Sequence, residues 1–323
     1  MADRKRKAAF IEPMLLLRAD TLPEGDAWQY ELKFDGYRAL AIKTGGTIQL
    51  RSRNDHDFSR RYPTIARAFS PLPNETVVDG EVVALDASGK PSFNILQNHA
   101  AGAALHCFVF DVLILSGRDV MGEPLTKRRE LMDRFICPKL AEPIRYSPLL
   151  DARLSDLVHS VKVQGLEGLV AKRKDSRYEP GERSGAWLKM RVNRGQEFVI
   201  GGYTVGGATF DALIFGYYED GRLIYAARTR NGFTPRLRQD LMKRFHSLQA
   251  AACPFANLPE TKSGRWGAGL TANKMADCRW LKPVLVGQFE FVEWTGENHL
   301  RHTRFMGLRD DKRPEDVVRE QSL

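Results

Sequence analysis

The stretch WQYELKFDGYRAL, which begins at Trp28, constrains the fold and chemistry of this chain more than any other. Apolar and polar residues alternate along it, with Trp28, Tyr30, Leu32 and Phe34 against Gln29, Glu31, Lys33 and Asp35. A period of two predicts a β-strand with one apolar face and one charged face. Lys33 lies between two carboxylates on the charged face, so we predict that this face borders a polar cavity.

Size and charge set the outer limits. A chain of 323 residues exceeds what one hydrophobic core usually supports, and its 43% hydrophobic content is normal for a globular protein, so we expect two domains. The formal net charge of +9 favours an anionic partner such as nucleic acid. Many soluble proteins are equally basic, so charge alone does not identify that partner.

Several classes of protein do not fit the sequence. The start MADRKRKAAFIEPMLLLRAD is interrupted by Glu12 and Pro13, so it does not resemble a signal peptide, and its RKRK is expected to be a flexible arm. No apolar run reaches the roughly eighteen residues of a membrane span. His299 and His302 form an HxxH without a third clustered ligand, which indicates surface or core histidines rather than zinc. The cysteines form no CxxC pair, which argues against a zinc ribbon or a disulfide framework and fits a reducing cytoplasm: Cys107, Cys137, Cys253 and Cys278.

The pattern of elements changes once along the chain. Strand patterns at GTIQLRSR, ETVVDGEVVALD, HCFVFDVLIL, GLVAKRK and AWLKMR, with helical patterns at 127–135 and 154–164, predict an α+β domain. The polar VNRGQE at 192–197 marks the change, so we divide the chain into domains 1–193 and 194–323. In the second domain, two apolar runs flank Asp220-Gly221, which predicts a type I′ hairpin and a small antiparallel barrel of OB type. Neither GxxxxGK(S/T) nor GxGxxG occurs, so any nucleotide is expected to be held by side chains.

Lys33 can act as a nucleophile only as a neutral amine. Deprotonating a lysine of pKa near 10.4 at pH 7 costs about 4.6 kcal/mol, and the carboxylates of Glu31 and Asp35 raise that cost. Cations must therefore offset them. A divalent metal bound through Asp35 or Glu167 would do so. In SGAWLKMR the same alternation also predicts one aromatic and two cationic residues on a common strand face: Trp187, Lys189 and Arg191.

Seven fragments occur in one order along residues 31–312: ELKFDGYR, SRND, DGE at 79–81, FVFDVL, EGLVAK, WLKMR and RHTRFMGLRDDK. They resemble motifs I, Ia, III, IIIa, IV, V and VI of ATP-dependent DNA ligases, members of the covalent nucleotidyltransferase superfamily, and most of all the ligase module of bacterial ligase D. The resemblance implies an adenylyltransferase (nucleotidyltransferase) domain, with ATP-grasp-like antiparallel sheets and helices, followed by an OB-fold β-barrel domain.

The resemblance also implies a nucleotide site. Lys33 would attack the α-phosphate of ATP and hold AMP through a P–N bond. Glu31 would accept a hydrogen bond from the adenine 6-amino group, and this role has a direct physical reason, because guanine presents a carbonyl acceptor at that position. Phe110 would stack on the purine, and Glu81 would bind the ribose hydroxyls. Leu32 belongs to the same nucleotide-binding set.

Further positions would act on phosphate and metal. Arg38 and Arg53 are candidates for gripping phosphate oxygens, because an arginine presents a fork of donors. Asp35 and Glu167 would bind Mg²⁺ or Mn²⁺. Three cations would surround the α-phosphate: Arg183, Lys189 and Arg191.

Two positions depart from the family, and one group lies far along the chain. Arg191 stands where lysine is common, and Asp55 stands where many relatives have glycine. In the second domain, a charged group would close over ATP and orient pyrophosphate: Arg309, Asp311 and Lys312.

The implied activity is ATP-dependent sealing of 3′-hydroxyl/5′-phosphate nicks or ends in double-stranded DNA, in repair such as non-homologous end joining. A monomer, a Ku-type end-binding partner and a cytoplasmic, nucleoid-associated location without membrane contact would follow. Two enzymatic alternatives stay open, an RNA ligase and a GTP-dependent mRNA-capping guanylyltransferase, although Glu31 argues against GTP. A non-catalytic DNA end-binding protein is the alternative of another class, and it predicts a broken motif residue that the named positions do not show.

Overall fold

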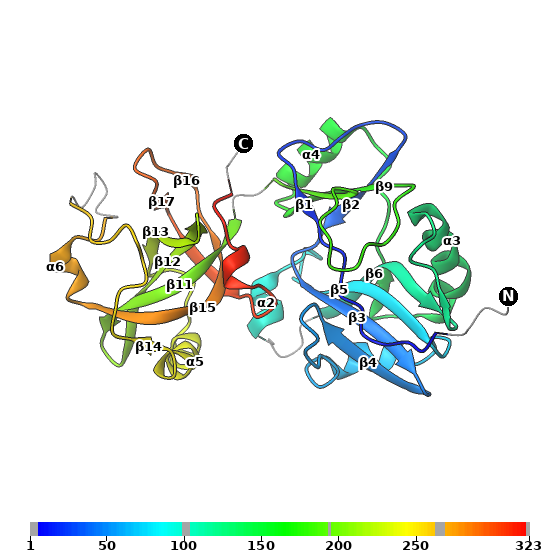
Figure 1. Cartoon of the computed structure of the whole chain (residues 1–323), viewed down its shortest axis with the longest axis horizontal. Helices are drawn as coiled ribbons and strands as arrows, with labels where there is room; N and C mark the ends of the chain where they lie inside the picture. The colour runs from blue at the N-terminus through cyan, green and yellow to red at the C-terminus, as the bar shows by residue number, and fades with distance from the viewer. Residues whose placement is uncertain (1–5, 99–103, 193–194, 262–268, 321–323) are drawn as a thin grey trace. The chain divides into compact units, whose positions relative to one another are not determined.

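The computed structural model describes residues 6–98, 104–192, 195–261 and 269–320. The chain divides into two compact units, Met1–Asn193 and Arg194–Leu323 (Figure 1). Helices and mostly antiparallel sheets make up the first unit, which confirms the predicted α+β class. No helix in the described ranges is long and apolar enough to cross a membrane.

The larger sheet of the first unit runs in the order β4 (Thr47–Ser52), β3 (Tyr37–Thr44), β5 (Thr76–Leu85), β6 (Ala104–Leu115) and β7 (Arg118–Asp119), and β8 (Ile144–Tyr146) pairs with β6 in parallel. The helices α1 (Pro63–Ala68) and α2 (Phe93–Asn98) contribute Ile65 and Phe93 to a core with Val78 and Val82 of β5. A second core joins the N-terminal segment to this sheet and includes Ile11, Met14, Leu40, Phe110 and Trp187.

The smaller sheet runs in the order β1 (Leu17–Arg18), β10 (Trp187–Arg191), β9 (Gly168–Arg173) and β2 (Trp28–Lys33). Its apolar face packs against α4 (Leu154–Val163). Trp28, Tyr30 and Leu32 lie on that face, which confirms the predicted alternation of β2. The helices predicted at 127–135 and 154–164 are also confirmed, as α3 (Leu125–Phe135) and α4.

Two details of the sequence prediction were wrong. Phe34 does not join the apolar face, because β2 ends at Lys33 and alternation no longer fixes the direction of the next side chain; its ring stacks on Phe108 with the centroids 4.2 Å apart. The arm RKRK lies partly outside the described residues, but from Arg6 onward it is held. Arg6 pairs with Asp119, and its backbone amide donates to the Gly117 carbonyl at 2.7 Å.

The second unit is built on an antiparallel sheet in the order β13 (Arg222–Thr229), β12 (Thr209–Glu219), β11 (Gly195–Gly206), β15 (Cys278–Glu290) and β14 (Gln249–Ala250), with β18 (Arg304–Leu308) also paired to β15. Asp220 and Gly221 have φ values of 50° and 72°, which confirms the predicted β12–β13 hairpin. Between β13 and β14 lies α5 (Pro235–His246), whose first turn is capped by the Thr234 hydroxyl. The antiparallel sheet agrees with the small antiparallel domain that the sequence predicted, whereas α5 was not predicted.

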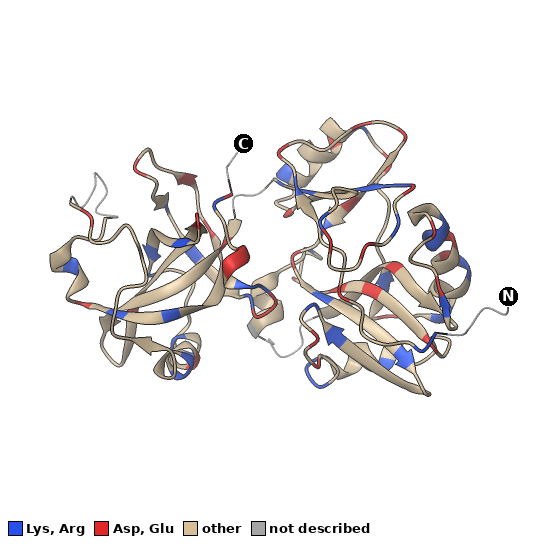
Figure 2. Ribbon diagram, viewed as in Figure 1, with Lys and Arg blue, Asp and Glu red and all other residues tan. Residues whose placement is uncertain are grey.

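Close packing in this unit depends on aromatic rings and a glycine. Phe215 and Phe289 stack with centroids 3.8 Å apart in a core that also contains Phe198. A Cβ at Gly216 would lie 1.9 Å from the Ile224 carbonyl oxygen, so only glycine lets β12 approach β13 there. The short elements are η1 (Cys137–Lys139) in the first unit, and α6 (Ala272–Met275), β16 (Glu293–Trp294), β17 (Leu300–Arg301) and η2 (Pro314–Asp316) in the second. Lysine and arginine are spread over both units, including α3 and α5 (Figure 2).

Candidate active site

The polar face of the smaller sheet carries the predicted residues in ordered cross-strand rows. Because β2, β9 and β10 pair in antiparallel register, residues far apart in sequence stand side by side. The first row is Lys33, Gly168 and Arg191; the second is Glu31, Val170 and Lys189; the third is Gln29, Lys172 and Trp187. The polar side chains predicted to alternate along β2 and β10 therefore lie on one continuous face of the sheet.

Lys33 lies at the end of β2 in direct contact with the start of β9. Its Nζ is 2.5 Å from Glu167 Oε1, and Arg191 Nε is 3.1 Å from the same oxygen. These three side chains are 11–14% exposed, so the charges are poorly screened by water. A Cβ at Gly168 would lie 2.1 Å from the Met190 carbonyl oxygen. Glycine after Glu167 is therefore what allows β9 to bring the carboxylate between Lys33 and Arg191.

Glu31 is enclosed by charges and is only 2% exposed. Its Oε1 accepts from Lys172 Nζ at 2.8 Å and from Arg129 Nη1 at 3.2 Å, and its Oε2 accepts from the Ser147 hydroxyl at 2.9 Å. Lys172 lies over the rings of Phe110 and Trp187, 4.3 and 4.5 Å from their centroids. Burial lowers the pKa of Lys172, although the carboxylate of Glu31 opposes that change.

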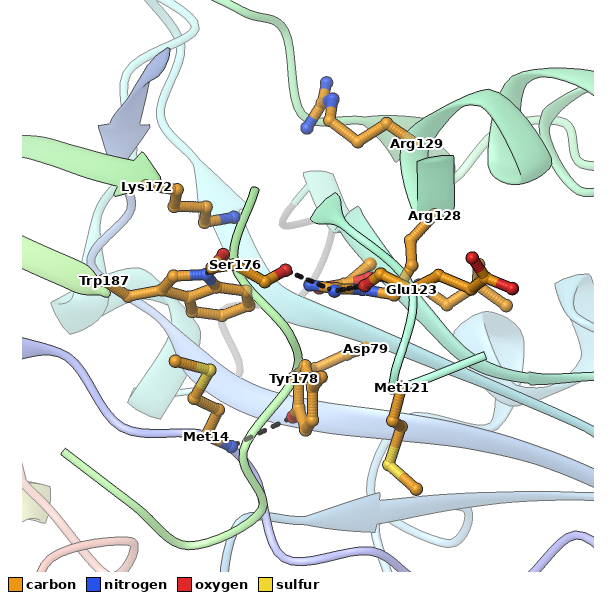
Figure 3. A network of polar contacts seen from close by, with 12 residues as sticks. Met14, Asp79, Met121, Glu123, Arg128, Arg129, Lys172, Ser176, Tyr178 and Trp187 are labelled. Atoms are coloured by element: carbon orange, nitrogen blue, oxygen red, sulfur yellow. Dashed lines mark hydrogen bonds and ion pairs between the residues drawn. The ribbon is translucent and has the colours of Figure 1, made fainter. Parts of the chain in front are cut away.

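Arg38 belongs to a second charged group, on the larger sheet. Its guanidinium donates to both oxygens of Asp79 at 2.6 Å and lies 4.6 Å from the centre of the Phe110 ring. Burial alone would lower the pKa of Arg38, but the carboxylate of Asp79 outweighs burial and raises it. Tyr178 donates to Asp79 at 2.6 Å and accepts from the Met14 amide at 3.0 Å (Figure 3). The group therefore joins Arg38 to the N-terminal segment.

A fully buried ion pair supports both charged groups from α3. Arg128 donates to both oxygens of Asp111 at 2.8 Å, and neither side chain is exposed. The same guanidinium donates to the carbonyls of Glu123 and Ser176, and the Ser176 hydroxyl accepts from the Trp187 indole at 3.3 Å (Figure 3). This network fixes the indole on which Lys172 rests.

The other predicted residues of the first unit are less tightly grouped. Glu81 pairs in register with Arg38 on the larger sheet, and Lys189 lies in the same row as Glu31. Leu32 packs its side chain on the apolar face, opposite Lys33. Arg183 is exposed and lies in the loop between β9 and β10 rather than on a strand. Arg53 follows β4 in a turn, and Asp35 follows β2.

The turn after β4 explains one departure from the family pattern. Asp55 has a φ of 60°, a left-handed conformation that glycine adopts freely and aspartate tolerates. Its carboxylate accepts from Arg51 at 2.7 Å, and its amide donates to the Ser52 carbonyl at 3.0 Å. These bonds hold the turn that carries Arg53.

The charged residues predicted in the second unit also form a group. Arg309 donates to both oxygens of Asp311 at 2.8 and 2.9 Å, and Lys312 lies 3.5 Å from Glu197. Burial acts to raise the pKa of Asp311, but Arg309 and Lys312 outweigh it and lower the pKa. His299, from the HxxH, is a buried histidine whose Nε2 lies 2.8 Å from Glu260. His302 is exposed.

Two carboxylates, Asp35 and Glu167, were predicted to bind a metal ion. The carboxylate of Glu167 lies beside Lys33. In the described part of the chain no group of three or more His, Cys, Asp or Glu side chains could hold a metal ion. A magnesium ion usually keeps several waters and uses one or two protein carboxylates with substrate phosphates. Glu167 and Asp35 fit that kind of site by their chemistry.

The sequence analysis missed several residues of these groups, among them Lys172, Asp79, Arg129 and Tyr178. Lys172 closes EGLVAK and Asp79 opens DGE, and a charge in an otherwise apolar strand is a signal that could have identified both. Arg129 and Tyr178 gave no such signal, because their partners Glu31 and Asp79 lie 98 and 99 residues away.

Comparison with known proteins identifies the same two units. Residues 13–191 match the family model "ATP dependent DNA ligase domain", and residues 206–312 match "ATP dependent DNA ligase C terminal region". The multifunctional non-homologous end joining DNA repair protein LigD of Mycobacterium tuberculosis is 34% identical over 298 residues, which cover 91% of this chain and 37% of that protein. The multifunctional non-homologous end joining protein LigD of Pseudomonas aeruginosa is 32% identical over 321 residues, covering 96% of this chain and 37% of the relative. The chain thus spans little more than a third of the length of these relatives.

One solved structure extends the agreement to three dimensions. Mycobacterial DNA ligase D complexed with ATP and MES is 32% identical and has a TM-score of 0.68, covering 96% of this chain and 98% of that chain. The predicted nucleotidyltransferase domain followed by an OB-fold domain is therefore confirmed. The match of the domain model over more than half of the chain, with the ordered motifs and the shared fold, shows that this protein belongs to the family of ATP-dependent DNA ligases.

Proposed function

We propose that this chain seals breaks that carry a 3′-hydroxyl and a 5′-phosphate in double-stranded DNA, in three steps. Lys33 takes AMP from ATP and releases pyrophosphate; AMP passes to the 5′-phosphate; the 3′-hydroxyl then attacks that phosphate and releases AMP. The observation that carries the proposal is Lys33 Nζ 2.5 Å from Glu167, with Arg191 3.1 Å from the same oxygen. In this proposal residues 1–193 form the adenylyltransferase domain and residues 194–323 form the OB-fold domain.

The charges around Lys33 suit phosphoryl chemistry. Arg191 and Lys189 are proposed to neutralise the α-phosphate as its charge develops, because both stand on the strand face that carries Lys33. Arg183 is kept in this set by the resemblance alone. Asp35 and Glu167 would hold Mg²⁺ or Mn²⁺, which supplies positive charge that masks the carboxylates and polarises the phosphate.

The nucleotide is proposed to lie along the same face. Glu31 would select adenine, Phe110 would contact the purine, and Glu81 would bind the ribose. Leu32 would contribute through its backbone, since its side chain packs on the other side of the sheet. For the second unit we propose that three residues act on the pyrophosphate of ATP in the first step, as the resemblance implies: Arg309, Asp311 and Lys312.

Basic side chains in both units support DNA as the partner (Figure 2). Arg38 and Arg53 are proposed to bind phosphate. The ion pair with Asp79 fixes the position of the Arg38 guanidinium. In the second unit a cavity of about 510 Å³ has cationic residues in its lining, among them Arg228 and Arg301. Neutralising several phosphates would make binding weaken steeply with salt.

The biological setting is inferred from the relatives. Non-homologous end joining is the proposed pathway, because the names of the LigD relatives state it. A Ku-type partner, a monomeric state and a cytoplasmic, nucleoid-associated location are proposed with it. Recruitment is tested by adding such an end-binding protein to a blunt-end joining assay; an unchanged joining rate would contradict it.

Sealing is tested with a nicked duplex labelled at its 5′-phosphate, incubated with the protein, ATP and magnesium. The expected product is a continuous strand, formed neither with EDTA nor by Lys33→Ala. Sealing of a nick in RNA but not in DNA would contradict the proposed substrate. Adenylylation of the protein without any sealing of a DNA nick would also contradict the proposed substrate.

A further inference from the structure

The carboxylate of Glu31 is held differently at its two oxygens. Oε1 accepts from Lys172 at 2.8 Å, from Arg129 at 3.2 Å and from Gln29 Nε2 at 3.3 Å. Oε2 accepts from the Ser147 hydroxyl at 2.9 Å. A carboxylate has about four lone-pair positions, two on each oxygen. The donors of the described residues occupy both positions on Oε1 and one position on Oε2. Oε2 therefore keeps capacity for one further donor.

Arg129 fixes the direction of this carboxylate. It reaches from α3 and is 5% exposed, with Nη1 on Glu31 and Nη2 donating to the Ser147 carbonyl at 3.0 Å. Its guanidinium lies 4.5 Å from the centre of the Tyr146 ring. One planar group thus ties Glu31 to the backbone of the residue whose hydroxyl binds Oε2. Figure 3 shows Arg129 on α3, extended away from the Arg128 network.

This arrangement matters for choosing between purines. A 6-amino group donates a hydrogen bond, and a 6-oxo group presents an acceptor that an ionised carboxylate repels. Discrimination needs the oxygen with remaining capacity to stay aimed at the base. Lys172 still balances the charge of Glu31 when Arg129 is removed, so the contribution of Arg129 is orientation.

We propose that Arg129 and Ser147 are positioning residues that set the base selectivity of adenylylation, by holding Glu31 Oε2 toward the 6-amino group of ATP. This inference rests on the proposed function of Lys33 and Glu31. It makes α3, through Arg129, an element that determines specificity. It also predicts that the two residues affect the choice of nucleotide more than the rate of phosphoryl transfer.

The test compares label transfer to the protein from ATP and from ITP, in which a 6-oxo group and a proton on N1 replace the 6-amino group and unprotonated N1 of adenine. Transfer from α-labelled nucleotide is measured over a range of concentrations for the wild type, Arg129→Met, Arg129→Lys and Ser147→Ala. The matched control is Arg134→Met, an exposed arginine on the same helix. For Arg129→Met the ratio of kcat/KM for ATP over ITP should fall about tenfold, the worth of one oriented hydrogen bond of about 1.4 kcal/mol.

The pattern across variants separates positioning from general damage. KM for ATP should rise in Arg129→Met while kcat at saturating ATP changes little, Arg129→Lys should recover part of the selectivity, and Arg134→Met should match the wild type. If Arg129→Met fails to fold, Ser147→Ala decides, because it removes one hydroxyl and should lower the ratio about threefold. A ratio that is unchanged in Ser147→Ala and in folded Arg129→Met would overturn the inference. Absence of label on the wild type would instead overturn the proposed function.

Discussion

At the residue scale, Arg191 is the cation whose identity departs from the family pattern, and it shares Glu167 with Lys33. Lysine in its place would keep the charge and lose the planar fork. Arg191→Lys should therefore adenylylate within about tenfold of the wild-type rate, whereas Arg191→Ala should lose about a hundredfold, typical of removing one stabilising charge. Single-turnover label transfer measures both. Equal rates for Arg191→Ala and the wild type would show that Arg191 does not act on the phosphate.

Asp79 is predicted to stabilise the fold as well as to position Arg38. Asp79→Asn would leave the Arg38 guanidinium without its carboxylate in a buried place, so the free energy of unfolding should fall by about 3 kcal/mol. Asp119→Asn is the matched control, because Asp119 pairs with Arg6 at the exposed surface and such pairs contribute about 0–1 kcal/mol. Urea unfolding followed by circular dichroism compares the two. Similar losses from both variants would contradict the assignment.

At the scale of elements, the pairing of β9 with β10 positions Glu167, and Gly168 permits it. A Cβ at Gly168 would lie 2.1 Å from the Met190 carbonyl oxygen, so Gly168→Ala should push the strands apart. We expect Gly168→Ala to slow adenylylation by at least about tenfold even at temperatures where it is fully folded, because Glu167 moves from Lys33. Gly122→Ala is the control, since a Cβ there meets nothing within 4 Å. A fully active, folded Gly168→Ala would show that the strand spacing is not critical.

The same elements mark what the sequence could and could not predict. The period of two predicted which residues of β2 and β10 share a face, because alternation is a local property. The motif order predicted that these faces belong to one site. Alternation ended with β2, so the direction of Phe34 was predicted wrongly. The partners of Glu31 come from α3, from the segment after β8 and from β9, and no local pattern reports contacts across such separations.

At the scale of the whole molecule, acid should destabilise the second unit through Asp311. Its pKa in the folded state lies below its ordinary value of 3.8, because Arg309 and Lys312 outweigh the effect of burial. The unfolded chain therefore binds the proton more readily, and the stability that Asp311 contributes is present above about pH 4 and is lost as the pH falls through the folded pKa. Thermal melting from about pH 6 to about pH 2.5 should show a steeper acid loss for the wild type than for Asp311→Asn. An equal fall in melting temperature with decreasing pH for the wild type and Asp311→Asn would contradict this account.

The central claim for the whole molecule is covalent chemistry at Lys33, and label transfer from α-labelled ATP to the 36.5 kDa protein tests it most directly. The protein is first treated with pyrophosphate to remove AMP carried from expression, then given magnesium and labelled ATP or GTP, with Lys33→Ala beside it. The account predicts a covalent label from ATP, little from GTP and none on Lys33→Ala. Label from GTP would indicate a capping-type enzyme. No label with any divalent metal would contradict the ligase mechanism and leave a protein that only binds DNA.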